Sequence, residues 1–206
     1  MRKACLLSVA AGLAQVSFAQ VNITQTFPID APILENLTAT RQSFTGADLF
    51  INGFNPALGT LKAVTITSYG NLVINTPVEN DTNLPISGDL SISTVLNAGV
   101  TLQNGTFLTA VGLTATNTRV ITAPARSDRL FSNRHELYGT VRITNTPENA
   151  PYFRYFSTPG PVVLQMRNFN THTLPAGTRV SRDIPPQFGI FGRFRGTIRI
   201  TYTYIP

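Results

Sequence analysis

Apolar and polar residues alternate along several short segments of this chain, and this two-residue period constrains the fold more than any other feature. The clearest case is Thr197–Tyr204, in which Ile198, Ile200, Tyr202 and Tyr204 alternate with threonine and arginine. Successive side chains of a β-strand point to opposite faces, so the pattern predicts a strand with one buried face. No amphipathic segment of helical period extends over ten or more residues after the first twenty. We therefore predict an all-β protein.

Turn residues, chiefly glycine, proline and asparagine, separate about a dozen such segments. Short antiparallel strands joined by turns of this kind are typical of two sheets packed face to face. A closed barrel is the alternative that the same pattern allows. We therefore expect one jelly-roll-like domain over residues 20–206, a two-sheet antiparallel β-sandwich without an internal repeat or a second domain.

The expected turns follow from local residue pairs. Gly70-Asn71 and Asn97-Ala98-Gly99 predict reversals of the chain, and Asn104-Gly105 is its strongest hairpin signal. The segments 76–89 and 122–137 are polar and lack strand alternation, so we expect surface loops there, with one helical turn as an alternative for the second.

The first nineteen residues have the parts of a secretory signal peptide. A basic start is followed by an apolar run over 6–18, which is shorter than a membrane-spanning helix. The small residues Ser17 and Ala19 stand at the −3 and −1 positions for cleavage before Gln20. We expect secretion and a mature chain that starts near Gln20, with an uncleaved N-terminal anchor as the alternative.

The composition of the mature chain excludes some sources of stability and chemistry. Its parent sequence has a single cysteine, Cys5, which lies in the expected signal peptide, so disulfides and thiolate chemistry are excluded. Hydrophobic residues make up 42% of the sequence, enough for a sizeable core. Charged residues make up 13%, about half the usual share. No later segment is apolar enough to predict a membrane span.

The charges are unevenly distributed along the chain. Residues 20–118 contain six acidic and two basic residues, whereas residues 119–206 contain twelve arginines and four acidic residues. A basic surface could meet nucleic acid, an envelope glycan or lipid head groups. It could equally meet the acidic half of its own fold or of another copy, and scattered solvated arginines are the simplest interpretation.

Few residues suggest a metal or catalytic site. Glu79, Asp81 and Asp89 flank one expected loop and could gather around a calcium ion, although the Asp-x-Asp-x-Asp-Gly motif is absent. A solvated acidic loop is the alternative. His135 and His172 are far apart, and neither has another ligand at metal-binding spacing. We predict no catalytic residues, no cofactor and no zinc site.

Aromatic residues beside an arginine form a candidate ligand face. Tyr152, Arg154 and Tyr155 are residue types that stack on sugars or bases. We expect a strand over Phe153–Ser157, in which alternate side chains point to opposite faces, so one set of rings would belong to the core. Tryptophan, a common sugar-stacking residue, is absent from the chain.

Two stretches resemble a known family. FNPALGTLKAVTIT at 54–67 resembles the N-terminal signature of choice-of-anchor E domains, and FGRFRGTIRITYTY at 191–204 resembles their closing strand. The resemblance implies an all-β domain exported by a bacterium, often followed by a Pro-Glu-Pro-type sorting segment, and it implies no catalytic set. This sequence ends at Pro206 after the last strand, so we expect release or non-covalent retention.

The first of these stretches also predicts a defined corner. Asn55-Pro56 initiates a turn because proline fixes its own φ and restricts the residue before it. Gly59 can adopt the positive φ that a tight reversal requires. We expect Phe54 and Leu58 to lie in the core, with Pro56 and Gly59 shaping the turn.

Taken together, these features predict a secreted, non-enzymatic structural or adhesive protein of the cell exterior or extracellular matrix. The alternative is a carbohydrate-binding module that recognises extracellular polysaccharide, and a hydrolase on a β scaffold is a third hypothesis. The expected partners are a second copy of the chain or envelope and matrix polysaccharide, with no nucleic acid.

Overall fold

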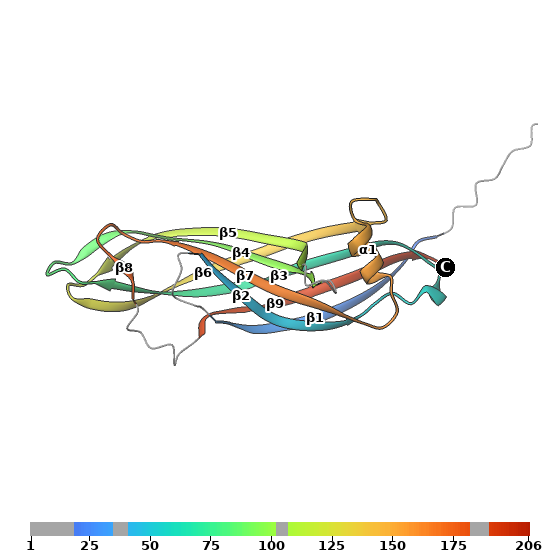
Figure 1. Cartoon of the computed structure of the whole chain (residues 1–206), viewed down its shortest axis with the longest axis horizontal. Helices are drawn as coiled ribbons and strands as arrows, with labels where there is room; N and C mark the ends of the chain where they lie inside the picture. Colours follow the sequence, from blue (N-terminus) through green and yellow to red (C-terminus); the bar gives the residue numbers. More distant parts are fainter. Residues whose placement is uncertain (1–18, 35–40, 102–106, 182–189) are drawn as a thin grey trace, which may run out of the picture.

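The computed structural model describes residues 19–34, 41–101, 107–181 and 190–206. Within these ranges the chain forms two antiparallel sheets that pack face to face, with one short α-helix (Figure 1). The prediction of an all-β two-sheet sandwich is therefore confirmed. The sandwich is elongated, with α1 and the C-terminus toward one end and β8 toward the other (Figure 1).

The strand order is that of a jelly roll. Sheet A runs in the order β1 (Val21–Leu34), β9 (Ile190–Ile205), β3 (Thr60–Asn80) and β6 (Ser127–Thr144), and β8 (Arg179–Val180) pairs with the end of β3. Sheet B runs in the order β2 (Arg41–Asn52), β7 (Pro161–Thr173), β4 (Ile86–Thr101) and β5 (Phe107–Ala123). Consecutive strands thus cross repeatedly between the sheets, as in two interlocked Greek keys.

One apolar core lies between the sheets. It is built from the inward-facing side chains of both, and completely buried members include Ile66, Leu72, Ile198 and Ile200 of sheet A and Leu90, Ile92 and Leu164 of sheet B. Burying one such side chain stabilises the folded state by about 1.5–3 kcal/mol. The alternation predicted for Thr197–Tyr204 is confirmed, because its isoleucines and tyrosines all face this core.

The strands are longer than predicted, because glycines that indicate turns in the sequence lie inside strands in the structure. Gly70 lies in the middle of β3, directly opposite Gly196 of β9. A Cβ added to Gly70 would lie 2.5 Å from the carbonyl oxygen of Arg195 and 2.7 Å from Cζ of Phe194. The predicted turn at Gly70-Asn71 is therefore wrong, since this glycine permits close packing under an aromatic ring rather than a reversal.

The other predicted turns and loops are also shorter than expected. β3 and β4 are separated by residues 81–85 alone, and β6 begins at Ser127, so most of 76–89 and 122–137 is strand. Asn97-Ala98-Gly99 lies within β4, where the register shifts between Ala98 and Gly99. The extra residue is Ala110 of β5, so Asn97, Ala98 and Gly99 all stay paired and do not reverse the chain. The Asn104-Gly105 hairpin signal lies outside the described residues.

The corner after β2 has the predicted form. Asn55 precedes the 3-10 helix η1 (Pro56–Leu58), and its Oδ1 accepts a hydrogen bond of 3.0 Å from the amide of Ala57. Gly59 follows with a φ of 138°, which a residue with a Cβ would adopt only with strain. Phe54 is buried against the rings of Tyr202 and Tyr204.

One half of the core prediction at this corner is wrong. Leu58 is 43% exposed, because it occupies the last position of η1, whose three residues all face solvent. The aromatic residue alone therefore anchors the corner, with ring centroids 6.0 Å from Tyr202 and 5.3 Å from Tyr204.

A helix replaces the strand expected at Phe153–Ser157. α1 (Ala150–Phe156) has Pro151 in its first turn, where the missing N–H costs nothing. Phe153 and Phe156 are three residues apart, so they share one helix face, and both are buried in the core. The aromatic residues here thus close one end of the sandwich.

Candidate functional site

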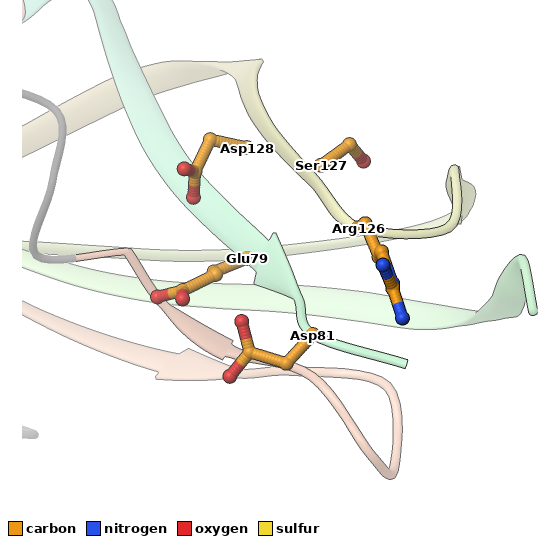
Figure 2. Close-up of a pocket in the computed structure, with 5 residues that line it drawn as sticks. All are labelled: Glu79, Asp81, Arg126, Ser127 and Asp128. Atoms are coloured by element: carbon orange, nitrogen blue, oxygen red, sulfur yellow. The ribbon is translucent and has the colours of Figure 1, made fainter. Parts of the chain in front are cut away.

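The expected acidic loop lies where β3 ends and β6 begins. Glu79 is opposite Asp128 of β6 on one side and opposite Arg179 of β8 on the other. A pocket of about 400 Å³ opens beside it, lined by Glu79, Asp81, Arg126, Ser127 and Asp128 (Figure 2). Figure 2 shows the carboxyl groups of Glu79 and Asp81 beside each other, with Arg126 directed away from them.

Arg179 connects these two carboxyl groups. Its Nε donates to Oε2 of Glu79 at 2.9 Å, and its Nη2 lies 2.5 Å from Oε1 of Glu79 and 2.8 Å from Oδ2 of Asp81. The hydrogen bond between the two carboxyl groups raises the pKa of Asp81 above its usual value. A guanidinium that contacts both acids in this way gives a paired ion network at the end of the sandwich.

The three residues predicted for calcium are not brought together. Glu79 and Asp81 meet, but Asp89 lies on β4 of the other sheet, opposite Val120 of β5. Among the described residues, no group of three or more histidine, cysteine or acidic side chains is arranged to hold a metal ion. In this structure the positive charge at the two acids is supplied by Arg179.

The predicted ligand face of Tyr152, Arg154 and Tyr155 lies on α1 rather than on a strand. Both tyrosine rings are half-buried and pack against the core, and the hydroxyl of Tyr155 lies 3.5 Å from the carbonyl oxygen of Val163. Arg154 is exposed. The helix therefore separates the rings from the guanidinium, and the three side chains do not form a common surface.

Two tyrosines that sequence reasoning missed form a pair on the outer surface of sheet A. Tyr69 of β3 is directly opposite Tyr138 of β6, and the two residues are 45% and 73% exposed. Residues directly opposite each other in antiparallel strands point to the same face, with Cβ atoms about 5 Å apart. Both tyrosines therefore project into solvent from neighbouring positions on this face, although their rings make no contact with each other.

Charged residues surround this pair on the same face. Tyr138, Tyr69, Thr197 and Pro28 are aligned across sheet A, and side chains an even number of residues from these positions point to the same face. The charged residues at such positions are Arg134, Glu136 and Arg142 of β6, Arg193, Arg195 and Arg199 of β9, and Asp30 of β1. All seven are exposed. We call these residues, together with Tyr69 and Tyr138, the tyrosine–arginine face. Five arginines against two carboxylates leave the face positively charged.

Three of the five arginines are already engaged. Arg193 forms a bidentate ion pair with Asp30, and Arg195 Nε lies 3.4 Å from Oδ1 of the same residue. The hydrogen bond from Arg193 lowers the pKa of Asp30 below its usual value. Arg134 donates two hydrogen bonds, of 3.0 and 2.8 Å, to Oδ1 of Asn71.

Among the described residues, the other two arginines of the face carry free guanidinium groups. Arg142 and Arg199 have no ion pair or side-chain hydrogen bond within the described parts of the chain. Arg199 lies opposite Thr67 and Arg142 lies opposite Thr65, so they flank β3 from its two neighbouring strands. Successive rows of one face are about 7 Å apart, which places Arg199 one row from the tyrosine pair.

Both histidines face the interior of the sandwich. His135 of β6 is 3% exposed, and burial lowers its pKa below the usual value. His172 of β7 lies with Nδ1 2.9 Å from Oγ1 of Thr76, a buried residue of β3. Neither imidazole belongs to the tyrosine–arginine face or to the acidic pocket. Neither described helix is long and apolar enough to cross a membrane.

Comparison with known proteins adds little to this geometry. No family model matches the chain and no curated protein matches it, so the resemblance to choice-of-anchor E domains stays a prediction. Similar solved structures include the VP2 subviral particle of infectious bursal disease virus, at 10% identity and a TM-score of 0.30, over 94% of this chain and 37% of that chain. The Gx strain of that virus matches at 10% identity and a TM-score of 0.27, over 98% of this chain and 45% of that chain.

The chain thus spans less than half the length of these viral chains. Similarity at this level carries no argument about function, because one fold hosts many unrelated activities. The class of protein defined here is a two-sheet jelly roll with an exposed aromatic and basic surface.

Proposed function

We propose that the protein is a non-enzymatic adhesive protein of the cell exterior that attaches to an extracellular surface through the tyrosine–arginine face. The observation that carries the proposal is the exposed pair of Tyr69 and Tyr138 on one face with Arg199 and Arg142, which have no ion partner among the described residues. Tyrosine and arginine are among the residues that contribute most binding energy at protein surfaces. The secretory signal peptide expected at 1–19 supports a location outside the cell.

Sheet B offers no comparable surface among its described residues. Its most exposed apolar side chains are Phe50 and Val120, which are 69% and 73% exposed. Phe50 lies on β2 and Val120 on β5, and these strands form the two opposite edges of the sheet. Single exposed apolar residues are normal on a protein surface, whereas an adjacent aromatic pair marks a candidate binding site.

A contact function also agrees with the placement of the ionisable groups. The histidines face the core, and the carboxyl groups of Glu79 and Asp81 are paired with Arg179. The groups open to solvent at the tyrosine–arginine face are mainly aromatic rings and guanidiniums, together with the carboxyl groups of Glu136 and Asp30. These groups bind by stacking and charge pairing rather than by transferring protons.

Co-sedimentation of the mature chain with extracellular matrix and cell envelopes from the source organism tests the proposal. The double variant Tyr69→Thr/Tyr138→Thr removes both rings and keeps a residue that favours strands. We expect this variant to stay in the supernatant while the wild-type chain sediments. Phe50→Thr, at an aromatic position of sheet B whose exposure lies between those of the two tyrosines, is the matched control and should sediment like the wild type.

Equal sedimentation of the double variant and the wild type would contradict the proposal, as would a wild-type chain that never sediments. A thermal unfolding curve for each variant establishes that the fold is intact before the comparison is made.

A further inference from the structure

We infer that the tyrosine–arginine face binds an acidic polysaccharide, whose sugar rings lie on Tyr69 and Tyr138 and whose carboxylates pair with Arg142 and Arg199. The inference rests on the proposed function, because it names the partner of the same surface. It is carried by three observations: two exposed tyrosines opposite each other, two guanidiniums without an ion partner among the described residues, and the excess positive charge of the face.

Tyr69 and Tyr138 project from neighbouring strands at a single row of the sheet, so together they present about twice the area of one ring. A tyrosine offers an apolar ring for the C–H faces of a sugar and a hydroxyl for its polar edge. Threonines 65, 67, 140, 197 and 201 continue the same face and add further hydroxyl groups.

Arg142 and Arg199 lie on opposite sides of β3, and within the described residues neither has a carboxylate to neutralise it. A guanidinium binds a carboxylate with two parallel hydrogen bonds, which makes arginine well suited to uronic acids. The rings and the arginines are thus arranged to recognise a chain that alternates apolar sugar surface with carboxylate groups.

The pattern of charges on the face favours a polysaccharide over single-stranded nucleic acid, which also stacks on aromatic rings beside arginine. A nucleic acid carries one phosphate per nucleotide and needs a continuous basic track. On this face Arg193 and Arg195 are held by Asp30, and Glu136 adds another negative charge. Within the described residues, the two free guanidiniums flank β3 and can each pair with one carboxylate, but they do not form such a track.

Affinity electrophoresis of the mature chain in native gels tests the inference. We expect polygalacturonate in the gel to retard the protein and neutral dextran to leave its mobility unchanged. Tyr69→Thr/Tyr138→Thr and Arg142→Gln/Arg199→Gln should each weaken retention by about tenfold or more, as expected when a charge-assisted hydrogen bond or a central aromatic contact is lost.

Matched controls separate a specific face from general basicity. Arg129→Gln/Arg154→Gln removes the same charge from exposed arginines outside the face, and Phe50→Thr removes an aromatic ring from sheet B. Both control variants should be retained like the wild type. Equal losses in the two arginine double variants would overturn the inference, because retention would then follow net charge alone.

Three further outcomes distinguish the possible failures. Tighter retention by poly-dT than by polygalacturonate would assign the face to nucleic acid and overturn the polysaccharide. If polygalacturonate does not retard the chain while matrix sedimentation still depends on Tyr69 and Tyr138, the inference fails and the proposed adhesive function stands. If sedimentation is also independent of both residues, the proposed function fails with it.

Discussion

Replacing Gly70 by alanine tests whether the glycines inside the strands serve close packing. The added Cβ would lie 2.5 Å from the carbonyl oxygen of Arg195, 2.7 Å from Cα of Gly196 and 2.7 Å from Cζ of Phe194. Two of these three atoms belong to the backbone of β9, which is paired with β3 along most of its length. Phe194 is 1% exposed, so its ring has little room to move.

The magnitude follows from these contacts. Overpacking a core costs about 1–3 kcal/mol, and we expect the upper end, about 3 kcal/mol, because backbone atoms cannot move aside as a flexible side chain can. With a urea m-value of about 2 kcal/mol/M, this loss lowers the unfolding midpoint by about 1.5 M. A typical domain has a free energy of unfolding of about 5–15 kcal/mol, so this loss would remove a large fraction of its stability.

Equilibrium urea unfolding followed by far-UV circular dichroism measures the loss. Gly112→Ala is the matched control, because the nearest atom to its added Cβ is the side-chain oxygen of Asn97, at 3.1 Å. We expect its midpoint to stay close to that of the wild type. Gly70→Ala combined with Phe194→Leu should lose less stability than the sum of the two single variants, since one of the clashes is removed. Equal midpoints for Gly70→Ala and Gly112→Ala would refute the packing argument.

Three further outcomes are expected from unfolding measurements. Phe54→Ala should cost about 3–5 kcal/mol in chemical denaturation because the ring is buried at the corner, whereas Leu58→Ala on the exposed side should cost under about 1 kcal/mol. Burial lowers the pKa of His135, so the unfolded chain takes up the proton first and stability should fall as the pH drops below about 6.5; urea midpoints measured between pH 7 and 5 should fall less in His135→Asn. Asn80→Ala should cost about 3 kcal/mol, read from its melting curve, because the buried amide donates to the carbonyl oxygens of Leu84, Ala123 and Pro124.

Local patterns were sufficient to predict the fold class and some of its details. Alternation at Thr197–Tyr204 predicted the buried face of β9, and Asn55-Pro56 with Gly59 predicted the corner after β2. In both cases neighbouring residues in the chain carry the physical cause, which is strand periodicity or backbone restriction.

The tyrosine–arginine face could not be predicted in this way because strand register is not a local property. Tyr69 and Tyr138 become neighbours only through the pairing of β3 with β6. Interpreting Gly70-Asn71 as a turn also broke β3 immediately after Tyr69, so its place within a long strand was hidden. The close approach of Gly70 to Gly196 is visible only once β9 is paired beside β3.

The segment around Arg154 shows a second limit. Its density of aromatic residues favours a strand by propensity, and tertiary packing determined a helix instead. The local signals that predict the helix are Pro151 at its start and the three-residue spacing of Phe153 and Phe156. These signals span less than two turns, which is too short for periodicity to outweigh propensity.

The uneven charge distribution illustrates a third limit. The sequence left open whether its acidic and basic halves meet within the fold or between molecules. The structure pairs Asp30 with Arg193 and Arg195, and pairs Glu79 and Asp81 with Arg179, all within one chain. Part of the asymmetry is therefore satisfied internally, and self-association stays a prediction that sedimentation at low and high salt can test.

Hydroxyl-radical footprinting of the mature chain, free and bound to extracellular matrix, tests the central claim most directly. Mass spectrometry then reports how strongly each exposed aromatic side chain is oxidised. If the outer face of sheet A is the binding surface, oxidation of Tyr69 and Tyr138 falls on binding, while oxidation of Phe50 on sheet B is unchanged. Protection of Phe50 with undiminished oxidation of the two tyrosines would contradict the account.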